Sequence, residues 1–199
     1  PVSELATFSA PGTRLQKHID MHQLPGTELS TGSLAQGMSV GVGMALADKI
    51  DNRKGRRVFV LIGDGESQEG QIWEAALSAA QLQLDNLVVI LDNNGCQVDG
   101  FTRNICNIEP VHDKWMGFGW HVQRVPGHDL ERIIEDIEYA RVILGKPHII
   151  IADTIKGKGI SFMENKPEWH AQALSEAQYQ QACRDLQAIY DQLAGEVIR

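Results

Sequence analysis

Short runs of apolar residues along this chain predict four strands. Residues 58–62 (VFVLI), 87–91 (LVVIL) and 148–152 (HIIIA) lack polar alternation, which is typical of parallel strands that are covered on both faces. Residues 121–125 predict a further strand. We therefore expect one mostly parallel sheet.

Helical periodicity occupies the intervals between these strands. Apolar residues recur at helical spacing over 68–84 and 130–144, so each predicted helix joins two strands in a strand–helix–strand unit. An amphipathic helix over 175–193 is expected to form a terminal cover, and 157–169 has little periodic signal and is expected to be a long loop.

A further helix is predicted at 33–50. Its Gly37, Gly41 and Ala45 are spaced four apart, and small residues at this spacing let another backbone pack closely against the helix. Together the elements predict an α/β fold, a mostly parallel sheet with helices on both faces, in a single domain over 1–199.

Composition places the chain among folded, globular proteins, with 43% hydrophobic and 22% charged residues. The net charge of −8 disfavours a nucleic-acid partner. The longest candidate span, 34–47, is too short and too polar to cross a membrane, and the first residues carry no secretory signal. Three cysteines without a C-x-x-C pair fit a reducing compartment, so we expect a cytoplasmic protein.

Polar residues follow two of the predicted strands at the points where these strands end. Gly63, Asp64 and Gly65 come directly after the first strand, and Asn94 comes just after the second. Because parallel strands end at one edge and ligands bind there, we expect Asp64 and Asn94 to meet. One carboxylate and one amide oxygen suit Mg²⁺ whose remaining ligands are water, a backbone carbonyl and phosphate oxygens.

The same residues favour a phosphate ligand. Gly65 has no Cβ, so its amide can approach a phosphate closely, and the helix that opens after Gly70 directs its positive end into the same region. Each turn taken alone is a common turn sequence, but here each one terminates a buried strand. The glycine spacing matches neither the dinucleotide fingerprint nor the P-loop, which disfavours both nucleotide classes.

Residues 63–100, GDGESQEGQIWEAALSAAQLQLDNLVVILDNNGCQVDG, closely resemble the thiamine-diphosphate motif of transketolases, which begins with GDG and ends with an Asn about 30 residues later. Residues 25–47 and 154–170 resemble the segments before and after that motif. The likeness covers nearly the whole chain. It is closest to the N-terminal subunit of split transketolases, in which the diphosphate-binding and pyrimidine-binding domains are separate chains.

The resemblance implies a thiamine diphosphate site with Mg²⁺, for which Ca²⁺ or Mn²⁺ could substitute. Asp64 and Asn94 would bind the metal through their side chains and Cys96 through its backbone carbonyl, while Gly65 would bind the diphosphate through its amide. The other implied cofactor contacts are Gly32 and Leu34 at the aminopyrimidine ring, Asp92 at the strand end, Lys156 near the diphosphate, and Glu69 and His170.

The resemblance also implies catalytic roles for His170, which would lie near the reacting sugar, and for His18, which matches a substrate-facing histidine. Glu69 and Glu74 match a carboxylate cluster at the family's subunit interface. Plainer interpretations remain open, since acids favour the first turns of a helix and a lysine in a glycine-rich loop is commonly solvated. The i, i+4 pair His18 and His22 lacks a third ligand nearby, which disfavours zinc.

The implied activity is that of a transferase, which moves a two-carbon ketol unit from a ketose phosphate to an aldose phosphate. The glutamate that activates the aminopyrimidine belongs to the pyrimidine-binding domain, which no segment here matches. We therefore expect a homo- or hetero-oligomer with a C-terminal transketolase subunit, and no activity of the chain alone. The family's N-terminal segment would precede Pro1 and is expected to be missing.

Departures from the family pattern and alternative functions stay open. The family's GSLGQG motif has Ala35 here, its GHP motif reads Lys17-His18-Ile19, and its WHG motif ends in Ala171, so substrate contacts can differ. The alternatives are another thiamine-diphosphate enzyme, such as a deoxyxylulose-phosphate synthase or a decarboxylating dehydrogenase component, and a non-catalytic cofactor-binding scaffold.

Overall fold

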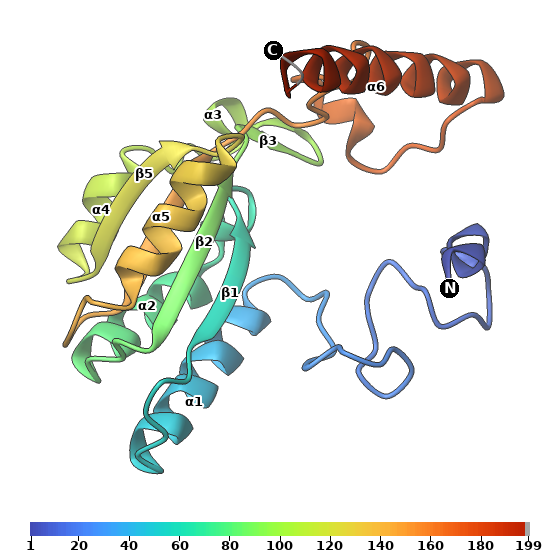
Figure 1. Cartoon of the computed structure of the whole chain (residues 1–199). Coiled ribbons are helices and arrows are strands. Elements are labelled where there is room, and N and C mark those ends of the chain that lie inside the picture. The colour runs from blue at the N-terminus through green and yellow to red at the C-terminus, as the bar shows by residue number, and fades with distance from the viewer. Residues whose placement is uncertain (198–199) are drawn as a thin grey trace.

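A four-stranded parallel sheet lies at the centre of the chain in the order β1-β2-β6-β5 (Figure 1). The computed structural model describes residues 1–197. The strands are β1 (Val58–Gly63), β2 (Leu87–Asn93), β5 (His121–Pro126) and β6 (His148–Asp153). All four predicted strands are confirmed, and their pairing register brings their carboxyl ends to one edge of the sheet.

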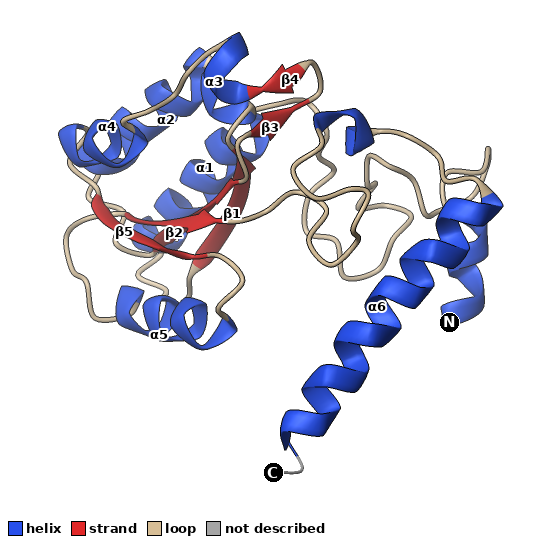
Figure 2. Cartoon of the chain, turned by 90° about the horizontal axis from the view of Figure 1, so that it is seen from above, coloured by secondary structure: helices blue, strands red, loops and turns tan. Residues whose placement is uncertain are grey.

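Helices cover the sheet from both sides (Figure 2). On one face lie α1 (Gln36–Ile50), α2 (Gly70–Gln81) and α4 (Val111–Gly117), and on the other lies α5 (Leu130–Ala140). The predicted layer arrangement is therefore confirmed. Between residues 1 and 197, no helix has the length and apolar character needed to cross a membrane.

Indole rings fill the core on the three-helix side. Trp115 is fully buried and packs on Trp73 and Trp120 at centroid distances of 5.2 and 4.8 Å. The indole N–H of Trp120 donates to the carbonyl of Ala76 at 2.9 Å, so its polar atom is satisfied. This packing joins α2, α4 and the residue just before β5.

The predicted close approach of α1 to the sheet occurs at Gly41. A Cβ at this position would lie 2.4 Å from Cγ2 of Val60 on β1, whereas a Cβ at Gly37 would find nothing nearer than 3.8 Å. Ala45, one turn further on, is fully buried. Of the three small residues in the stripe, Gly41 is thus the one that the packing requires.

Several helices are shorter than predicted. The prediction began α1 at residue 33, but Ala35 adopts a left-handed conformation with φ of 67°, which delays the start to Gln36. The turn η2 (Glu66–Gln68) precedes α2, and α5 ends four residues before the predicted limit. The elements η1 (Val2–Thr7), β3 (Cys96–Gln97), β4 (Gly100–Phe101), α3 (Thr102–Ile105), α4 and η3 (Pro167–His170) were not predicted, since short elements show no periodicity.

The expectation that β1 is covered on both faces is wrong. Burial alternates along the strand: Phe59 and Leu61 are 50% and 70% exposed, whereas Val60 and Ile62 are buried. The reason is that β1 lies at the edge of the sheet, and α5 packs instead on Val88, Val125 and Ile150 of the other strands.

The expectation that the last helix covers the fold also needs correction. In α6 (Glu176–Val197), Leu186 and Leu193 are 49% and 56% exposed, and the helix extends away from the sheet (Figures 1 and 2). It contacts the 157–170 segment, where Ser161 donates from both its N–H and its hydroxyl to Asp185. Amphipathic periodicity correctly predicts the helix but not which surface it lies on.

An uncharged histidine is buried at the amino-terminal ends of the strands, opposite the turns that follow β1 and β2. His148, the first residue of β6, is 1% exposed, and neither of its ring nitrogens has a hydrogen-bond partner among the described residues. Burial, followed by the nearby charge of His121, lowers the pKa of His148 to about 4. The ring is therefore neutral in the folded protein at neutral pH.

We predict that His148 makes the fold sensitive to acid. Because its folded pKa lies below the ordinary 6.5, stability is complete above pH 6.5 and falls as the pH is lowered towards 4, by about 3 kcal/mol in the free energy of unfolding. Buried Asp136, whose pKa is raised, opposes this trend, so the variant must be compared with the wild type. Urea unfolding of His148→Leu between pH 4 and 8 should lose this slope, and the partly exposed control His112→Leu should keep it. Equal slopes would contradict the assignment.

Candidate functional site

A single buried carboxylate joins the turns that follow β1 and β2. Asp64 is 1% exposed; its Oδ1 accepts the N–H of Gly65 at 2.7 Å and its Oδ2 accepts the N–H of Gly95 at 2.5 Å. The two turns are thus held together through the bond from Gly95 to Asp64. In this structure the Gly65 amide is engaged by Asp64.

The side chain of Asn94 is oriented by its neighbours. Its Nδ2 donates to Asp92 Oδ2 at 2.8 Å, and its Oδ1 accepts the N–H of Cys96 at 2.9 Å. The other oxygen of Asp92 accepts the hydroxyl of Thr154. Both oxygens of Asp92, which was expected to contact a cofactor, therefore hold protein groups, and they fix which way the amide of Asn94 points.

Sequence reasoning missed Thr154. This residue directly follows β6, and β6 pairs with β2 so that Asp153 lies opposite Asn93. Its N–H donates to the carbonyl of Asn93 at 3.3 Å. The signal that could have found it is positional, because residues that follow adjacent parallel strands meet at one edge.

The electrostatics at this edge favour a cation. Burial raises the pKa of Asp64, while the Gly65 and Gly95 amides and the charge of Lys156 act in the opposite direction. Burial also raises the pKa of the Cys96 thiol, which is 3% exposed. The thiol is therefore protonated at neutral pH, and Cys96 offers a ligand only its backbone carbonyl.

The oxygen atoms present fit a divalent ion that keeps other ligands. Within residues 1–197 no three or more His, Cys, Asp or Glu side chains gather closely enough to hold a metal ion by themselves. Asp64 and Asn94 supply one carboxylate and one amide oxygen, each with a lone pair beyond its backbone bond. This hard-oxygen set suits Mg²⁺ that takes its remaining ligands from a phosphate and water.

The 154–170 segment brings Lys156 and His170 to the same side. The carbonyl of Lys156 accepts the N–H of Asn165 at 3.0 Å, which closes the loop, and η3 packs against β3 and β4. Partial burial and then the charge of Lys156 lower the pKa of His170. The charge of Lys156 is therefore felt by Asp64, Cys96 and His170 together.

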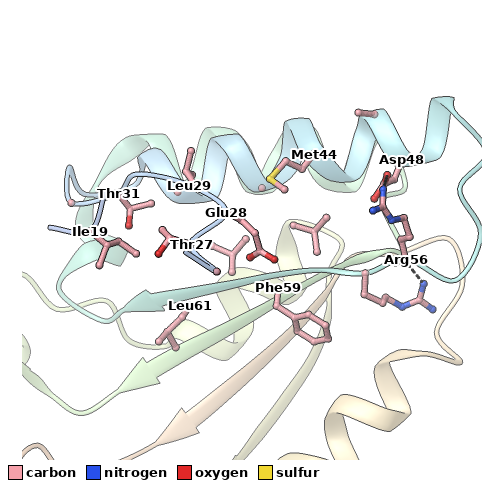
Figure 3. A pocket seen from close by; sticks show the side chains of 18 of the residues that line it. Ile19, Thr27, Glu28, Leu29, Thr31, Met44, Asp48, Arg56, Phe59 and Leu61 are labelled. Atoms are coloured by element: carbon pink, nitrogen blue, oxygen red, sulfur yellow. Dashed lines mark hydrogen bonds and ion pairs between the residues drawn. The ribbon is translucent and has the colours of Figure 1, made fainter. Parts of the chain in front are cut away.

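Two further residues that were expected to contact the cofactor, Gly32 and Leu34, lie on the segment before α1. Gly32 has φ of +150°, and a Cβ there would lie 2.7 Å from ring atoms of His18, so the imidazole packs directly on this glycine. Leu34 is 55% exposed in the same turn. The turn lines a cavity of about 970 Å³ between residues 19–34, α1 and β1 (Figure 3). Asp64 and Asn94 do not line this cavity.

The structure does not bring Glu69 and Glu74 to the strand-end turns. Both lie at the exposed surface near the start of α2, and neither side chain has a hydrogen bond or ion pair in the described part of the chain. Their carboxylates are therefore free for another partner.

We predict that Gly157 determines the shape of the Lys156 loop. It has φ of +74°, and a Cβ would lie 2.8 Å from the backbone oxygen of Met163. Gly157→Ala should cost roughly 2 kcal/mol, because both the left-handed conformation and the clash oppose a side chain. Urea unfolding measures the loss, and Gly55→Ala, with φ of +85° but open space around it, separates the clash from the conformation. Equal losses in the two variants would contradict a clash at Gly157.

A parallel sheet with polar residues at the carboxyl ends of its strands is typical of α/β domains that bind a ligand at those strand ends. Residues 1–190 match the family model described as transketolase, thiamine diphosphate binding domain. The chain belongs to this family.

Relatives and solved structures agree with this membership. The chain is 46% identical over 187 residues to the 6-deoxy-6-sulfo-D-fructose transketolase subunit SqwG of Clostridium sp. (strain MSTE9), covering 94% of this chain and 68% of that protein. It is 45% identical to one of the subunits of the apulose-4-phosphate transketolase of Actinobacillus succinogenes, covering 85% of this chain and 61% of that protein. The Campylobacter jejuni transketolase structure superposes with a TM-score of 0.86 at 30% identity, covering 93% of this chain and 30% of that one. The chain thus spans about two thirds of the curated subunits and under a third of the solved enzyme.

Proposed function

We propose that this chain is the N-terminal, thiamine-diphosphate-binding subunit of a split transketolase. With a C-terminal subunit it transfers a two-carbon ketol unit from a ketose phosphate to an aldose phosphate. The observation that carries the proposal is the buried Asp64 carboxylate that joins the two strand-end turns, in a chain whose relatives are named as transketolase subunits. Three free cysteines support a reducing, cytoplasmic location.

In this proposal the strand-end turns hold the cofactor by its diphosphate. Asp64, Asn94 and the carbonyl of Cys96 would hold Mg²⁺, and Gly65, whose N–H donates to Asp64 in this structure, would lie beside the diphosphate. Lys156 adds a positive charge beside these acidic groups. Bound thiamine diphosphate supplies the reactive carbon for breaking and forming carbon–carbon bonds.

The remaining proposed site residues surround the substrate. The pKa of His170 is lowered, so its imidazole is uncharged at neutral pH and can accept a proton or a hydrogen bond from a sugar hydroxyl. His18 is held against Gly32, beside the turn that carries Leu34. We assign this turn to the aminopyrimidine ring and the two histidines to the sugar.

The proposed partner completes the site. Glu69, just before α2, and Glu74, on α2, are exposed and unpaired in the described residues, which supports their placement at a subunit interface. The named substrates of two relatives, 6-deoxy-6-sulfo-D-fructose and apulose 4-phosphate, are both ketoses with an anionic group. We therefore propose a ketose with a terminal anion as the donor.

We predict that Asp64→Asn strongly weakens Mg²⁺-dependent cofactor binding. The change keeps the shape of the side chain but removes the charge that binds the metal and replaces an acceptor with an amide donor, so thiamine diphosphate should bind about 100-fold more weakly. Calorimetry with and without Mg²⁺ measures this, and the exposed Asp99→Asn on the nearby hairpin is the matched control. Unchanged affinity in Asp64→Asn would instead favour a scaffold without a working site.

A second prediction concerns the partner. Protein purified from its source cells should show a native mass that includes a second chain, and ketol transfer should require both chains, because the proposed site is shared between them. Intact masses of each chain alongside the native mass identify the partner. Ketol transfer by the pure chain, or a native assembly of this chain alone, would contradict the split-enzyme proposal.

A further inference from the structure

We infer that Glu66 is a positioning residue that sets the spacing between the two ends of the cofactor. Its Oε1 accepts the N–H of Ala35 at 2.8 Å and its Oε2 accepts the N–H of Gly63 at 3.2 Å. One carboxylate thus ties the turn before α1 to the end of β1. The inference rests on the proposed function, which assigns the aminopyrimidine to the turn before α1 and the diphosphate to the turn after β1.

The Ala35 end of this link is under strain. Ala35 is 1% exposed and adopts a left-handed φ of 67°, a conformation that alanine rarely takes. A buried backbone N–H also needs an acceptor, and Glu66 supplies it. Because the acceptor is a carboxylate, the bond is stronger than one to a neutral oxygen. Glu66 therefore stabilises the conformation that presents Gly32 and Leu34.

The Gly63 end does not depend on Glu66. The carbonyl of Gly63 accepts the hydroxyl of Ser67 at 3.0 Å, and the N–H of Asp64 donates to the carbonyl of Asp92 at 3.2 Å. The Asp64 carboxylate also accepts the N–H of Gly65 in the turn after β1 and the N–H of Gly95 in the turn after β2. Loss of the Glu66 carboxylate should therefore move the 32–35 turn and leave the diphosphate turn in place.

Helix α1 has a separate attachment to α2. Gln36 Nε2 donates to Gln71 Oε1 at 2.7 Å, and Gln71 Nε2 donates to Ser39 Oγ at 2.7 Å. A Glu66 variant should consequently keep both helices and the fold. Its effect should appear in the turn before the helix.

The test compares two probes, thiamine diphosphate and inorganic diphosphate, each with Mg²⁺. Glu66→Gln keeps the size of the side chain but leaves one acceptor for two amides. We expect the full chain, with its partner subunit where one co-purifies, to bind thiamine diphosphate about tenfold more weakly, and inorganic diphosphate within about twofold of the wild type. Calorimetry gives both affinities. Glu131→Gln, an exposed acid on the far helix, is the matched control and should change neither.

The pattern of results separates the possibilities. A fall for thiamine diphosphate alone supports the positioning role, and urea unfolding of the same variant shows whether the fold is intact. Equal weakening of both probes, or no change in either, overturns the role of Glu66 while the proposed function stands. Failure of the wild type to bind thiamine diphosphate overturns the proposed function and this inference with it.

Discussion

The site depends on one buried carboxylate. Asp64 lies at 1% exposure between two strand-end turns and binds a backbone amide from each. An isolated buried carboxylate is costly, and two amide donors offset only part of that cost, as its raised pKa indicates. A divalent cation beside it would relieve the remainder, so the fold carries at this point an electrostatic reason to bind a cation.

The sheet determines where the rest of the site lies. The register places Gly63 opposite Asp92 and Asn93 opposite Asp153, so the residues after β1, β2 and β6 arrive at one edge. Strands packed by a dense core vary little in position, so the orientation of Asn94 by Asp92 and Thr154 follows from the register. His18 and Leu34, by contrast, lie on exposed loop segments, and His170 is exposed at the end of the short helix η3.

The sequence predicts what depends on local pattern and misses what depends on contacts between distant segments. The strands end within a residue or two of their predicted limits, and the meeting of the 64 and 94 turns follows from the ends of buried parallel strands. The late start of α1 could not be predicted, because Ala35 is held by Glu66, 31 residues away. The exposure of Phe59 and Leu61 was also not predicted, because an apolar run does not indicate which faces of a strand are covered by helices.

The groups at the strand ends are held by the sheet, whereas the segments of His18 and His170 are exposed, and this difference affects which parts of the site can vary in sequence. Asp64 and Asn94, which we propose to hold the diphosphate through Mg²⁺, are tied to backbone amides at the end of the sheet, so altering them would disturb the fold as well as binding. Of the departures from the family motifs, Ala35 is buried in the core, whereas Ile19 and Ala171 fall in the exposed segments that carry His18 and His170. Substitutions there leave the core untouched. With the proposed assignment of these two segments to the sugar, sugar preference can diverge between relatives while the means of holding the cofactor stays the same.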